Sequence, residues 1–387
     1  MLKKTSGILY FFYMRIVADR NIPLVSEAFS QFGRVTLVNG REICRETVAD
    51  ADILLVRSVT KVNHELIDHT SVRFVGTATI GTDHVDQGYL AVKAIGFAAA
   101  PGSNALSVAQ YLTCALVSIS RKLSMDLNGK IIGIIGAGNV GFRVAPLARA
   151  LSMRCMLCDP PLQRASSGSS FFSLEQLLRE SDVLTLHVPL TTTGADATLG
   201  MAHDGFFKAM KPGSIFINTS RGPVVAEEAL RAHRDKLAAI VLDVWENEPD
   251  INLETLRATN IATPHIAGYS FDGKASGTKM LYEAACTFFG MQPRWSDVSP
   301  AIAHTPTVID VRDASDPLAK ALNAAYPIDD DDALLREIPR HDHRGAYFDF
   351  LRASYRTRLE FEHFTVVCAP GHRKEARTLQ QLGFDVR

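Results

Sequence analysis

The sequence lacks an excess of charge of either sign. Its 41 Lys and Arg residues are balanced by 42 Asp and Glu residues, which leaves a formal net charge of -1 at pH 7. A chain with this balance has no global positive field that could hold nucleic acid or an anionic membrane surface. We therefore expect no nucleic-acid partner and no membrane partner, and any anion-binding site must be local.

Cysteine is sparse, and long apolar runs are missing. The six cysteines are scattered over 387 residues and form no disulfide framework, which favours a reducing compartment and predicts a cytoplasmic protein. No stretch approaches the ~20 uninterrupted apolar residues of a membrane-spanning helix. Residues 8–13 form a short apolar run with no cleavage site after it, so we interpret residues 1–13 as an N-terminal extension. The fold is expected to begin near Met14.

Patterns typical of metal sites are weak. Cys155 and Cys158 form a CxxC pair, but no second pair follows at zinc-site spacing, so we interpret them as core residues. His341 and His343 flank an aspartate next to a glycine, which is more typical of a solvated turn than of a metal site. The sequence therefore predicts no metal.

Apolar residues in short runs are abundant. With 47% hydrophobic and 21% charged residues, the chain can fill two or three cores. β-Branched or Leu-rich runs alternate with helical segments up to about residue 290, and several runs are apolar on both faces. This rhythm predicts an α/β protein with two doubly wound, Rossmann-like parallel sheets covered by helices on each side. The expected strands are residues 15–18, 53–56, 74–77, 130–135, 154–158, 183–188, 214–218 and 238–242.

The most specific motif is a glycine-rich turn between a buried strand and a helix. In residues 136–141 (GAGNVG), the first glycine allows a tight turn, the second lets the backbone approach a pyrophosphate, and the third lets helix pack on strand. Asp159 ends the next strand, where a carboxylate binds ribose hydroxyls and repels a 2'-phosphate, which favours NAD over NADP. The residues expected to hold NAD here are Gly136, Gly138, Asn139, Val140, Gly141 and Asp159.

Three polar residues follow later strands of the same predicted sheet. Arg221, Glu248 and His265 each lie in a loop after a strand, and ligands of an open parallel sheet bind at the carboxyl ends of its strands. Histidine, with an ordinary pKa near ~6.5, suits the base that takes a hydroxyl proton as a 2-hydroxy acid is oxidised. A neighbouring carboxylate would orient the imidazole, and a guanidinium would bind the substrate carboxylate. The three therefore indicate a dehydrogenase site.

Taken in order, these motifs resemble the D-2-hydroxyacid dehydrogenases, whose catalytic triad has the same order of Arg, Glu and His. The resemblance runs from about Met14 to Gly290 and continues more faintly into the tail. It is closest to one branch, which oxidises a four-carbon, 4-phosphorylated 2-hydroxy acid on the route to vitamin B6. The segments that carry it are 56–63 (VRSVTKVN), 74–79 (FVGTAT), 81–86 (GTDHVD), 158–161 (CDPP), 241–245 (VLDVW) and 265–269 (HIAGY).

The resemblance implies roles for individual residues. Arg221, Glu248 and His265 would be catalytic, with His265 as proton donor or acceptor. NAD would also contact Val188, Asp243 and Gly268. The substrate would contact Arg57, Ser58, Thr79 and Tyr269. Two residues depart from the family pattern: Ile80 replaces a small residue, and Val188 stands where a threonine would offer the cofactor a hydroxyl.

The family fold also implies a domain order. The substrate domain would comprise residues 14–108 and 269–290, with the NAD-binding domain, residues 109–268, inserted between them. Residues 291–387 would form a separate α/β dimerisation module, as in the branch that the chain resembles.

The tail itself offers two hints about this module. Four residues at helical spacing form an apolar stripe within residues 345–360, and a thin core of under 100 residues would gain stability by burying that stripe against a second copy. We therefore expect a homodimer. Arg352 and Arg356, four apart, would share one face of the helix, which is more typical of a solvated basic face than of a second phosphate contact. The stripe consists of Phe348, Leu351, Tyr355 and Leu359.

Two alternative functions stay open. The first is another D-2-hydroxyacid dehydrogenase, of the phosphoglycerate or glyoxylate type; a phosphate pocket on Arg57 and Ser58 argues against glyoxylate, and the long tail argues against phosphoglycerate. The second is an NAD-sensing corepressor on the same fold, which could keep the triad without turnover.

Overall fold

The computed structural model describes residues 13–166, 171–295 and 307–387. These fall into two compact units. The first comprises residues 13–103 and 274–295, and the second comprises the described residues of 104–273 and 307–387. The predicted extension, residues 1–13, lies outside the described residues except for its last residue, Tyr13.

The first unit is built on a five-stranded parallel sheet with the order β2-β1-β3-β4-β5. Side chains alternate along each strand, so that Ile16 and Phe74 lie in one core and Val17 and Val75 in another. The strands are β1 (Met14–Asp19), β2 (Gly33–Val38), β3 (Ile53–Val56), β4 (Phe74–Thr77) and β5 (Gly96–Ala99). Its helices are α1 (Val25–Phe29), α2 (Arg45–Val48), α3 (His64–Ile67), α4 (Gln87–Val92) and most of α12 (Phe271–Phe289).

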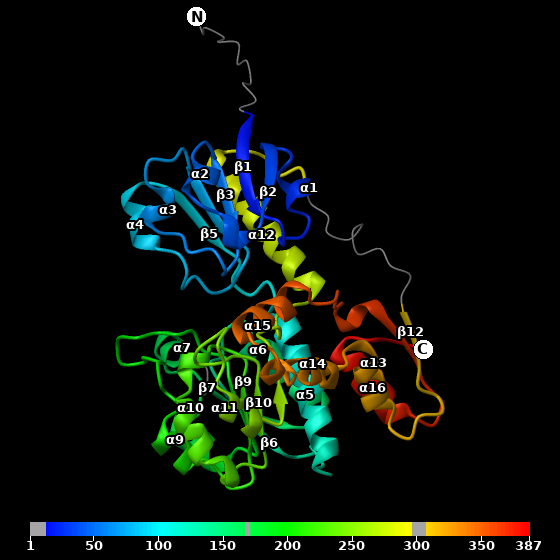
Figure 1. The fold of residues 1–387 in the computed structure, drawn as a ribbon. Helices are drawn as coiled ribbons and strands as arrows, with labels where there is room; N and C mark the ends of the chain where they lie inside the picture. The colour runs from blue at the N-terminus through cyan, green and yellow to red at the C-terminus, as the bar shows by residue number, and fades with distance from the viewer. Residues whose placement is uncertain (1–12, 167–170, 296–306) are drawn as a thin grey trace, which may run out of the picture. The chain divides into compact units, whose positions relative to one another are not determined.

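The second unit is built on a six-stranded parallel sheet with the order β11-β10-β9-β8-β6-β7 (Figure 1). The strands are β6 (Ile131–Ile135), β7 (Arg154–Cys158), β8 (Val183–Leu186), β9 (Ile215–Asn218), β10 (Ala239–Leu242) and β11 (Ile261–Ala262). The helices before residue 270 are α5 (Ala105–Lys122), α6 (Gly141–Ala150), α7 (Pro160–Ala165), α8 (Leu174–Glu180), α9 (Asp204–Ala209), α10 (Glu227–Ala232) and α11 (Leu253–Ala258).

The two parallel sheets confirm the predicted fold class. All eight expected strands are present, with ends displaced by at most two residues. Three strands of these sheets were not predicted, for different physical reasons. β2 is an edge strand with partly exposed residues, β5 consists of small residues around one phenylalanine, and β11 has only two residues. None of the three has the continuous apolar character of a central parallel strand.

The C-terminal residues form a small parallel sheet of their own, β12-β13-β14, but belong to the second unit. Leu322 and Val366 lie in the same apolar cluster as Leu112 of α5. The predicted separate module therefore shares its core with the six-stranded sheet. Its elements are β12 (Thr307–Asp310), α13 (Pro317–Ala325), α14 (Ile328–Leu335), α15 (Arg344–Ala353), β13 (Phe364–Val367), α16 (Arg373–Leu382) and β14 (Asp385–Val386).

The expected helical stripe is wrong in its second half. Helix α15 ends at Ala353, so Tyr355 and Leu359 lie beyond it. Phe348 and Leu351 are buried in the apolar cluster that covers one face of the six-stranded sheet. The stripe is therefore covered by its own chain, because the tail packs on the second unit instead of standing apart from it.

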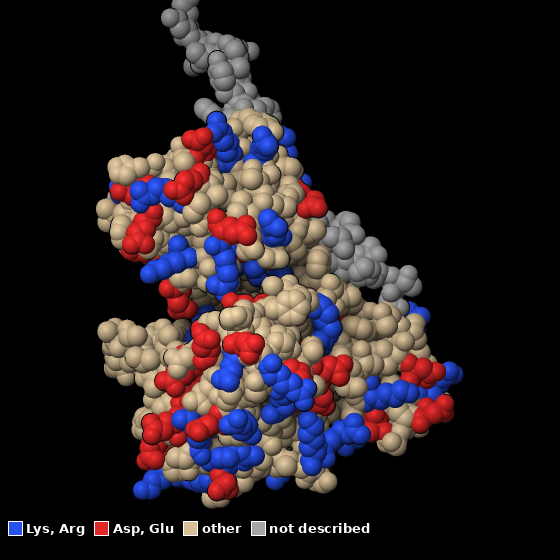
Figure 2. Space-filling view, viewed as in Figure 1, with Lys and Arg blue, Asp and Glu red and all other residues tan. Residues whose placement is uncertain are grey.

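Charged side chains of opposite sign lie next to one another over the face shown in Figure 2. On this face, positive and negative side chains are therefore mixed, and neither sign forms one large patch. No helix in the described part of the chain has the length and apolar character needed to cross a bilayer.

Candidate active site

Three predicted residues lie after three neighbouring strands of the second unit. Arg221 follows β9, Glu248 lies in the loop after β10, and His265 follows β11. These strands are adjacent and parallel, and adjacent strands lie about 4.8 Å apart. The fold therefore brings residues that are 17 to 44 positions apart in sequence to one edge of one sheet.

The central contact joins His265 and Glu248. The imidazole Nδ1 lies 2.7 Å from Glu248 Oε2, while the other carboxylate oxygen accepts a hydrogen bond of 2.9 Å from the Trp245 N–H. Burial by itself would raise the pKa of Glu248, but the charge and hydrogen bond of His265 lower it below its ordinary value. An ionised carboxylate thus holds one imidazole nitrogen and leaves Nε2 for chemistry.

Asp243 holds the loop that carries His265. Its side chain is 1% exposed and accepts hydrogen bonds from Thr263 Oγ1 (2.7 Å), Ile266 N–H (2.8 Å) and Ala267 N–H (2.9 Å). Burial raises the pKa of this carboxyl group. His265 has φ of 57°, an unfavourable backbone conformation for a residue other than glycine, which persists only where the surroundings impose it. The carboxylate predicted to contact NAD therefore also shapes the loop of His265.

Arg221 lies at the start of a short 3-10 helix, residues 222–224. Its Nη1 donates to the Ser220 carbonyl at 2.7 Å, and its own carbonyl accepts from the Asn218 side chain at 3.0 Å. Gly222 has to be a glycine, since a Cβ there would lie 1.7 Å from the Trp245 carbonyl oxygen. This close approach joins the loop of Arg221 to the loop of Glu248.

The glycine turn has the geometry of a dinucleotide cradle. Gly136 has φ of 90°, and a Cβ there would lie 2.3 Å from the His187 carbonyl oxygen. A Cβ on Gly141 would lie 2.1 Å from the Gly136 carbonyl oxygen, so strand, turn and helix are in close contact. At Gly138 a Cβ would meet nothing within 4 Å, which leaves open space over the turn. Exposed Asn139 and partly buried Val140 complete the turn before α6.

Asp159 is bound to this turn. One carboxylate oxygen accepts from Ala137 N–H and the other from Leu162 N–H, both at 2.9 Å, so Asp159 also caps α7. Val188 packs on the other side, where its Cγ1 would lie 3.0 Å from a Cβ on Gly136. Gly268 faces Asn104, whose side-chain nitrogen would lie 2.1 Å from an added Cβ. These contacts leave Gly268 no room for a side chain.

The residues predicted to bind substrate in the first unit lie after β3 and β4, which are adjacent parallel strands. Arg57 Nε pairs with the buried Asp19 carboxylate at 2.9 Å, and Ser58 is exposed beside it. Thr79 Oγ1 lies 2.7 Å from Thr77 Oγ1 and donates to the Gly81 carbonyl at 2.8 Å. The three predicted residues thus share the carboxyl edge of the smaller sheet.

The C-terminal segment adds a residue that sequence analysis did not assign to the site. Arg352, near the end of α15, places its guanidinium carbon 5.8 Å from the centre of the Tyr269 ring. Arg356 lies beyond the helix and pairs with buried Asp331, so the two arginines do not share a helical face as predicted. Only the approximate helical position of Arg352 was accessible from sequence, because its partners are about 80 to 100 residues away.

One group of possible metal ligands occurs in the described part of the chain. The ligand atoms of Asp272, Glu362 and His363 lie within 4.8 Å of one another. His363 Nε2 already pairs with Asp272 Oδ1 at 2.7 Å, and Glu362 is exposed. An ion pair accounts for this proximity, and we assign no metal.

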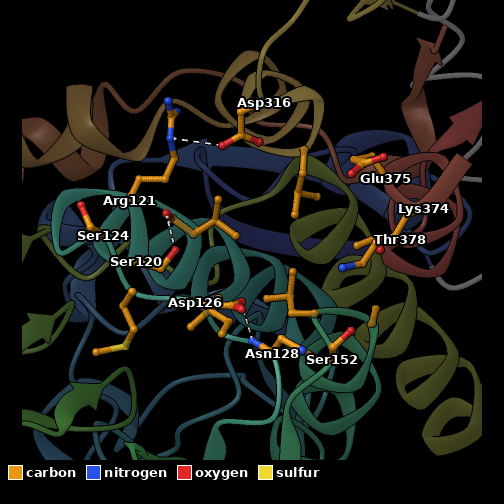
Figure 3. A pocket seen from close by; sticks show the side chains of 16 residues that line it. Ser120, Arg121, Ser124, Asp126, Asn128, Ser152, Asp316, Lys374, Glu375 and Thr378 are labelled. Carbon is orange, nitrogen blue, oxygen red and sulfur yellow. Dashed lines mark hydrogen bonds and ion pairs between the residues drawn. The ribbon is translucent and has the colours of Figure 1, made fainter. Parts of the chain in front are cut away.

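A surface pocket of about 430 Å³ lies away from the predicted residues (Figure 3). It is lined by the end of α5, the segment before β6, and parts of α13 and α16, with an Arg121–Asp316 ion pair of 3.3 Å in its wall. The segment before β6 lies at the amino end of that strand, opposite the edge that carries His265. None of the predicted site residues lines this pocket.

Comparison with known proteins identifies the class of this fold and site. The family model described as D-isomer specific 2-hydroxyacid dehydrogenase, NAD binding domain, matches residues 108–267. A second model, described as a domain of unknown function (DUF3410), matches residues 307–383. The structure of a 3-phosphoglycerate dehydrogenase from Entamoeba histolytica with bound NAD⁺ is similar at 26% identity and a TM-score of 0.61. The match covers 72% of this chain and 95% of the chain in that structure.

Two relatives match nearly the whole chain. A protein of Salinibacter ruber named erythronate-4-phosphate dehydrogenase is 44% identical, covering 94% of this chain and 97% of its own length. A protein of the same name from Yersinia pestis (strain Pestoides F) is 43% identical, covering 96% and 99%. The chain therefore belongs to the erythronate-4-phosphate dehydrogenase family, a branch of the D-isomer specific 2-hydroxyacid dehydrogenases. This is the branch that the substrate-domain motifs indicated.

Proposed function

We propose that the protein oxidises 4-phospho-D-erythronate with NAD to (3R)-3-hydroxy-2-oxo-4-phosphooxybutanoate, a step of pyridoxal 5'-phosphate (vitamin B6) biosynthesis. The observation that carries this proposal is the 2.7 Å contact between His265 Nδ1 and Glu248 Oε2 at the carboxyl edge of an NAD-binding sheet. The name of the relatives that match along the whole chain supports the choice of substrate.

His265 is the base of the proposed reaction. Because Nδ1 is bound to Glu248, the nitrogen left to remove the proton from the substrate's C2 hydroxyl is Nε2. The ionised Glu248 carboxylate fixes the ring orientation and stabilises the imidazolium that forms. Arg221 offers a planar fork of donors for the substrate carboxylate.

The residues around the glycine turn fit NAD. Open space at Gly138 accommodates a pyrophosphate, and the amino end of α6 supplies N–H groups and partial positive charge to it. Asp159 would offer carboxylate oxygens to ribose hydroxyls, Val188 would provide an apolar wall, and Gly268 would offer its backbone to the cofactor. When bound, NAD supplies the hydride acceptor for C2.

The proposed substrate contacts are the four residues that the family resemblance implies. Arg57, Ser58 and Thr79 would bind the phosphorylated acid from the first unit, and Tyr269 from the second. The pairing of Arg57 with buried Asp19 holds its guanidinium in place, because the buried carboxylate is itself fixed within the core. A phosphate would then meet an arginine that is already oriented.

We also propose that the protein is cytoplasmic and forms a homodimer through residues 291–387. All six cysteines are free thiols, which suits a reducing compartment. Strand β12 lies at an edge of the small sheet, and its Val308 is 62% exposed, so a second copy would cover both unpaired backbone groups and apolar surface. Sedimentation of the full chain as a monomer at micromolar concentration would overturn the dimer.

The test of function is a comparison of three acids. We expect NADH to form from 4-phospho-D-erythronate with a higher kcat/KM than from 3-phosphoglycerate or glycolate. The His265→Ala variant, assayed beside the wild type, gives the background. Oxidation of phosphoglycerate without oxidation of phosphoerythronate would show that the protein is a dehydrogenase of the phosphoglycerate type. NAD binding without turnover of any acid would favour an NAD-sensing corepressor.

A further inference from the structure

We propose that Arg352, from the C-terminal helix α15, is a positioning residue of the reaction site, which orients Tyr269 and adds a positive charge beside the loop of Glu248. The proposal rests on the proposed function, since it assigns Arg352 to the same site. It gives the C-terminal segment, residues 344–360, a part in the chemistry as well as in the fold.

Helix α15 is fixed against the loop that carries Glu248. Phe348 and Leu351 are buried in the same apolar cluster as Trp245, which lies three residues before Glu248. At the other end of the helix, a Cβ on Gly345 would lie 2.7 Å from Asp250 Oδ1. The helix therefore approaches the Glu248 loop closely at its start and is anchored by apolar contacts further along.

The same segment holds the backbone on both sides of Tyr269. Before the tyrosine, Arg358 donates to the Ala267 carbonyl at 2.5 Å. After it, Phe271 N–H donates to the Arg358 carbonyl at 2.7 Å, and Ser270 Oγ donates to Glu360 at 2.9 Å. Tyr269 thus lies in a stretch of chain that the C-terminal segment fixes by hydrogen bonds on either side.

Arg352 adds a cation at this point. Its guanidinium carbon lies 5.8 Å from the Tyr269 ring centre, within the range of cation–π attraction, and Tyr355 meets the same ring edge-on at 5.9 Å. The Arg352 Nε is buried and has no hydrogen-bond partner. A guanidinium with a buried, unused donor is costly unless its charge is compensated nearby, and Glu248 is one of the groups that compensate it.

The charge of Arg352 acts on Glu248 in the same direction as His265 does. Both cations lower the pKa of the Glu248 carboxyl group against the effect of burial, which raises it. Other charged or titratable groups belong to the arrangement: Asp243 interacts with His265, Asp349 and Tyr269 interact with Arg352, and Tyr355 packs on Tyr269. Without Arg352, the pKa of Glu248 would be higher, because the Arg352 charge would no longer oppose the effect of burial.

The test uses two substitutions with different chemistry in the full-length enzyme. Arg352→Gln removes the charge, so we expect kcat/KM for phosphoerythronate to fall roughly tenfold and its acid limb to move to higher pH. Arg352→Lys keeps the charge but loses the planar group beside Tyr269. The lysine variant should therefore keep the acid limb of the wild type while its KM rises.

Arg336→Gln is the matched control. Arg336 caps the end of α14 and pairs with Asp332 at 2.8 Å, so its loss removes a partly buried arginine from a position outside residues 344–360. We expect its pH profile to match the wild type. An unchanged acid limb and kcat/KM in Arg352→Gln would overturn the proposal, as would an equal shift in Arg336→Gln. Absence of turnover in the wild type would instead refute the proposed function.

Discussion

Replacing Asp243 with alanine tests whether this buried carboxylate shapes the loop of His265. The substitution removes the acceptor of three hydrogen bonds, two of them from the backbone N–H groups of Ile266 and Ala267. The third donor, Thr263 Oγ1, retains Tyr111 Oη at 2.7 Å as a partner. Each orphaned buried donor costs about 1–3 kcal/mol, so the free energy of unfolding should fall by roughly 2–6 kcal/mol.

The loss of activity should exceed what the lower stability explains. His265 stays at φ of 57° only while the surrounding bonds impose this conformation, whose cost is about 1–3 kcal/mol. Once Asp243 no longer holds the loop, relaxation of the backbone moves the imidazole away from its working position. A displacement of about 1 Å can cost about 10²-fold in rate. We therefore expect kcat to fall by about that factor under conditions in which the variant is fully folded.

The assay combines urea denaturation with NADH formation from phosphoerythronate, and Asp182→Ala is its control. Asp182 also accepts a backbone hydrogen bond, from Ile131 N–H at 2.9 Å, but at the amino end of the strands. Its loss should lower stability and leave kcat of the folded enzyme unchanged. If Asp243→Ala loses stability yet keeps the kcat of the wild type, the carboxylate does not position His265 and the reasoning fails.

Four further substitutions test the site and one buried histidine. His265→Ala should lower kcat by about 10²- to 10⁴-fold, and Glu248→Gln should shift the pH optimum; near-normal turnover without the imidazole would contradict the mechanism. Asp159→Ala should narrow the preference for NAD over NADP and weaken NAD binding, measured by kcat/KM for each cofactor, because Ala137 N–H also loses its acceptor. Burial lowers the pKa of His187 to about 3 from 6.5, so only the unfolded chain gains this proton between those values. The free energy of unfolding should therefore fall with decreasing pH by up to about 1.4 kcal/mol per unit, and His187→Gln should flatten a urea series between pH 4 and 7.

Local sequence was sufficient to locate the central strands and the cofactor turn. Strands such as β3 and β4 are apolar on both faces because both are covered, so their pattern is visible without a partner. Gly136 and Gly141 were recognisable from the sequence because the backbone atoms that exclude a side chain there lie within a few residues along the chain or on the neighbouring strand. Edge strands β2 and β5 were missed, since their residues are partly exposed and resemble loops, and β11 was missed because it has only two residues.

The C-terminal segment shows where such inference fails. The sequence pattern predicted one helix over residues 345–360, and its apolar stripe was expected to be buried against a second copy of the chain. The helix ends at Ala353, and Phe348 and Leu351 pack on the dinucleotide-binding sheet of the same chain. An apolar stripe indicates that a face is buried, but it does not indicate which surface covers it.

The sequence by itself determined the class of the fold, the cofactor turn and the three residues of the proposed reaction, because these depend on local patterns and on the order of parallel strands. Only the tertiary structure decided that Glu248 meets His265 at 2.7 Å, that Asp243 is used to hold a loop, and that Arg352 lies over Tyr269. Such contacts join segments far apart along the chain. The distances across these contacts depend on how the sheets and helices pack against one another. When a charged group is buried, this packing fixes the position of the group together with that of its partner.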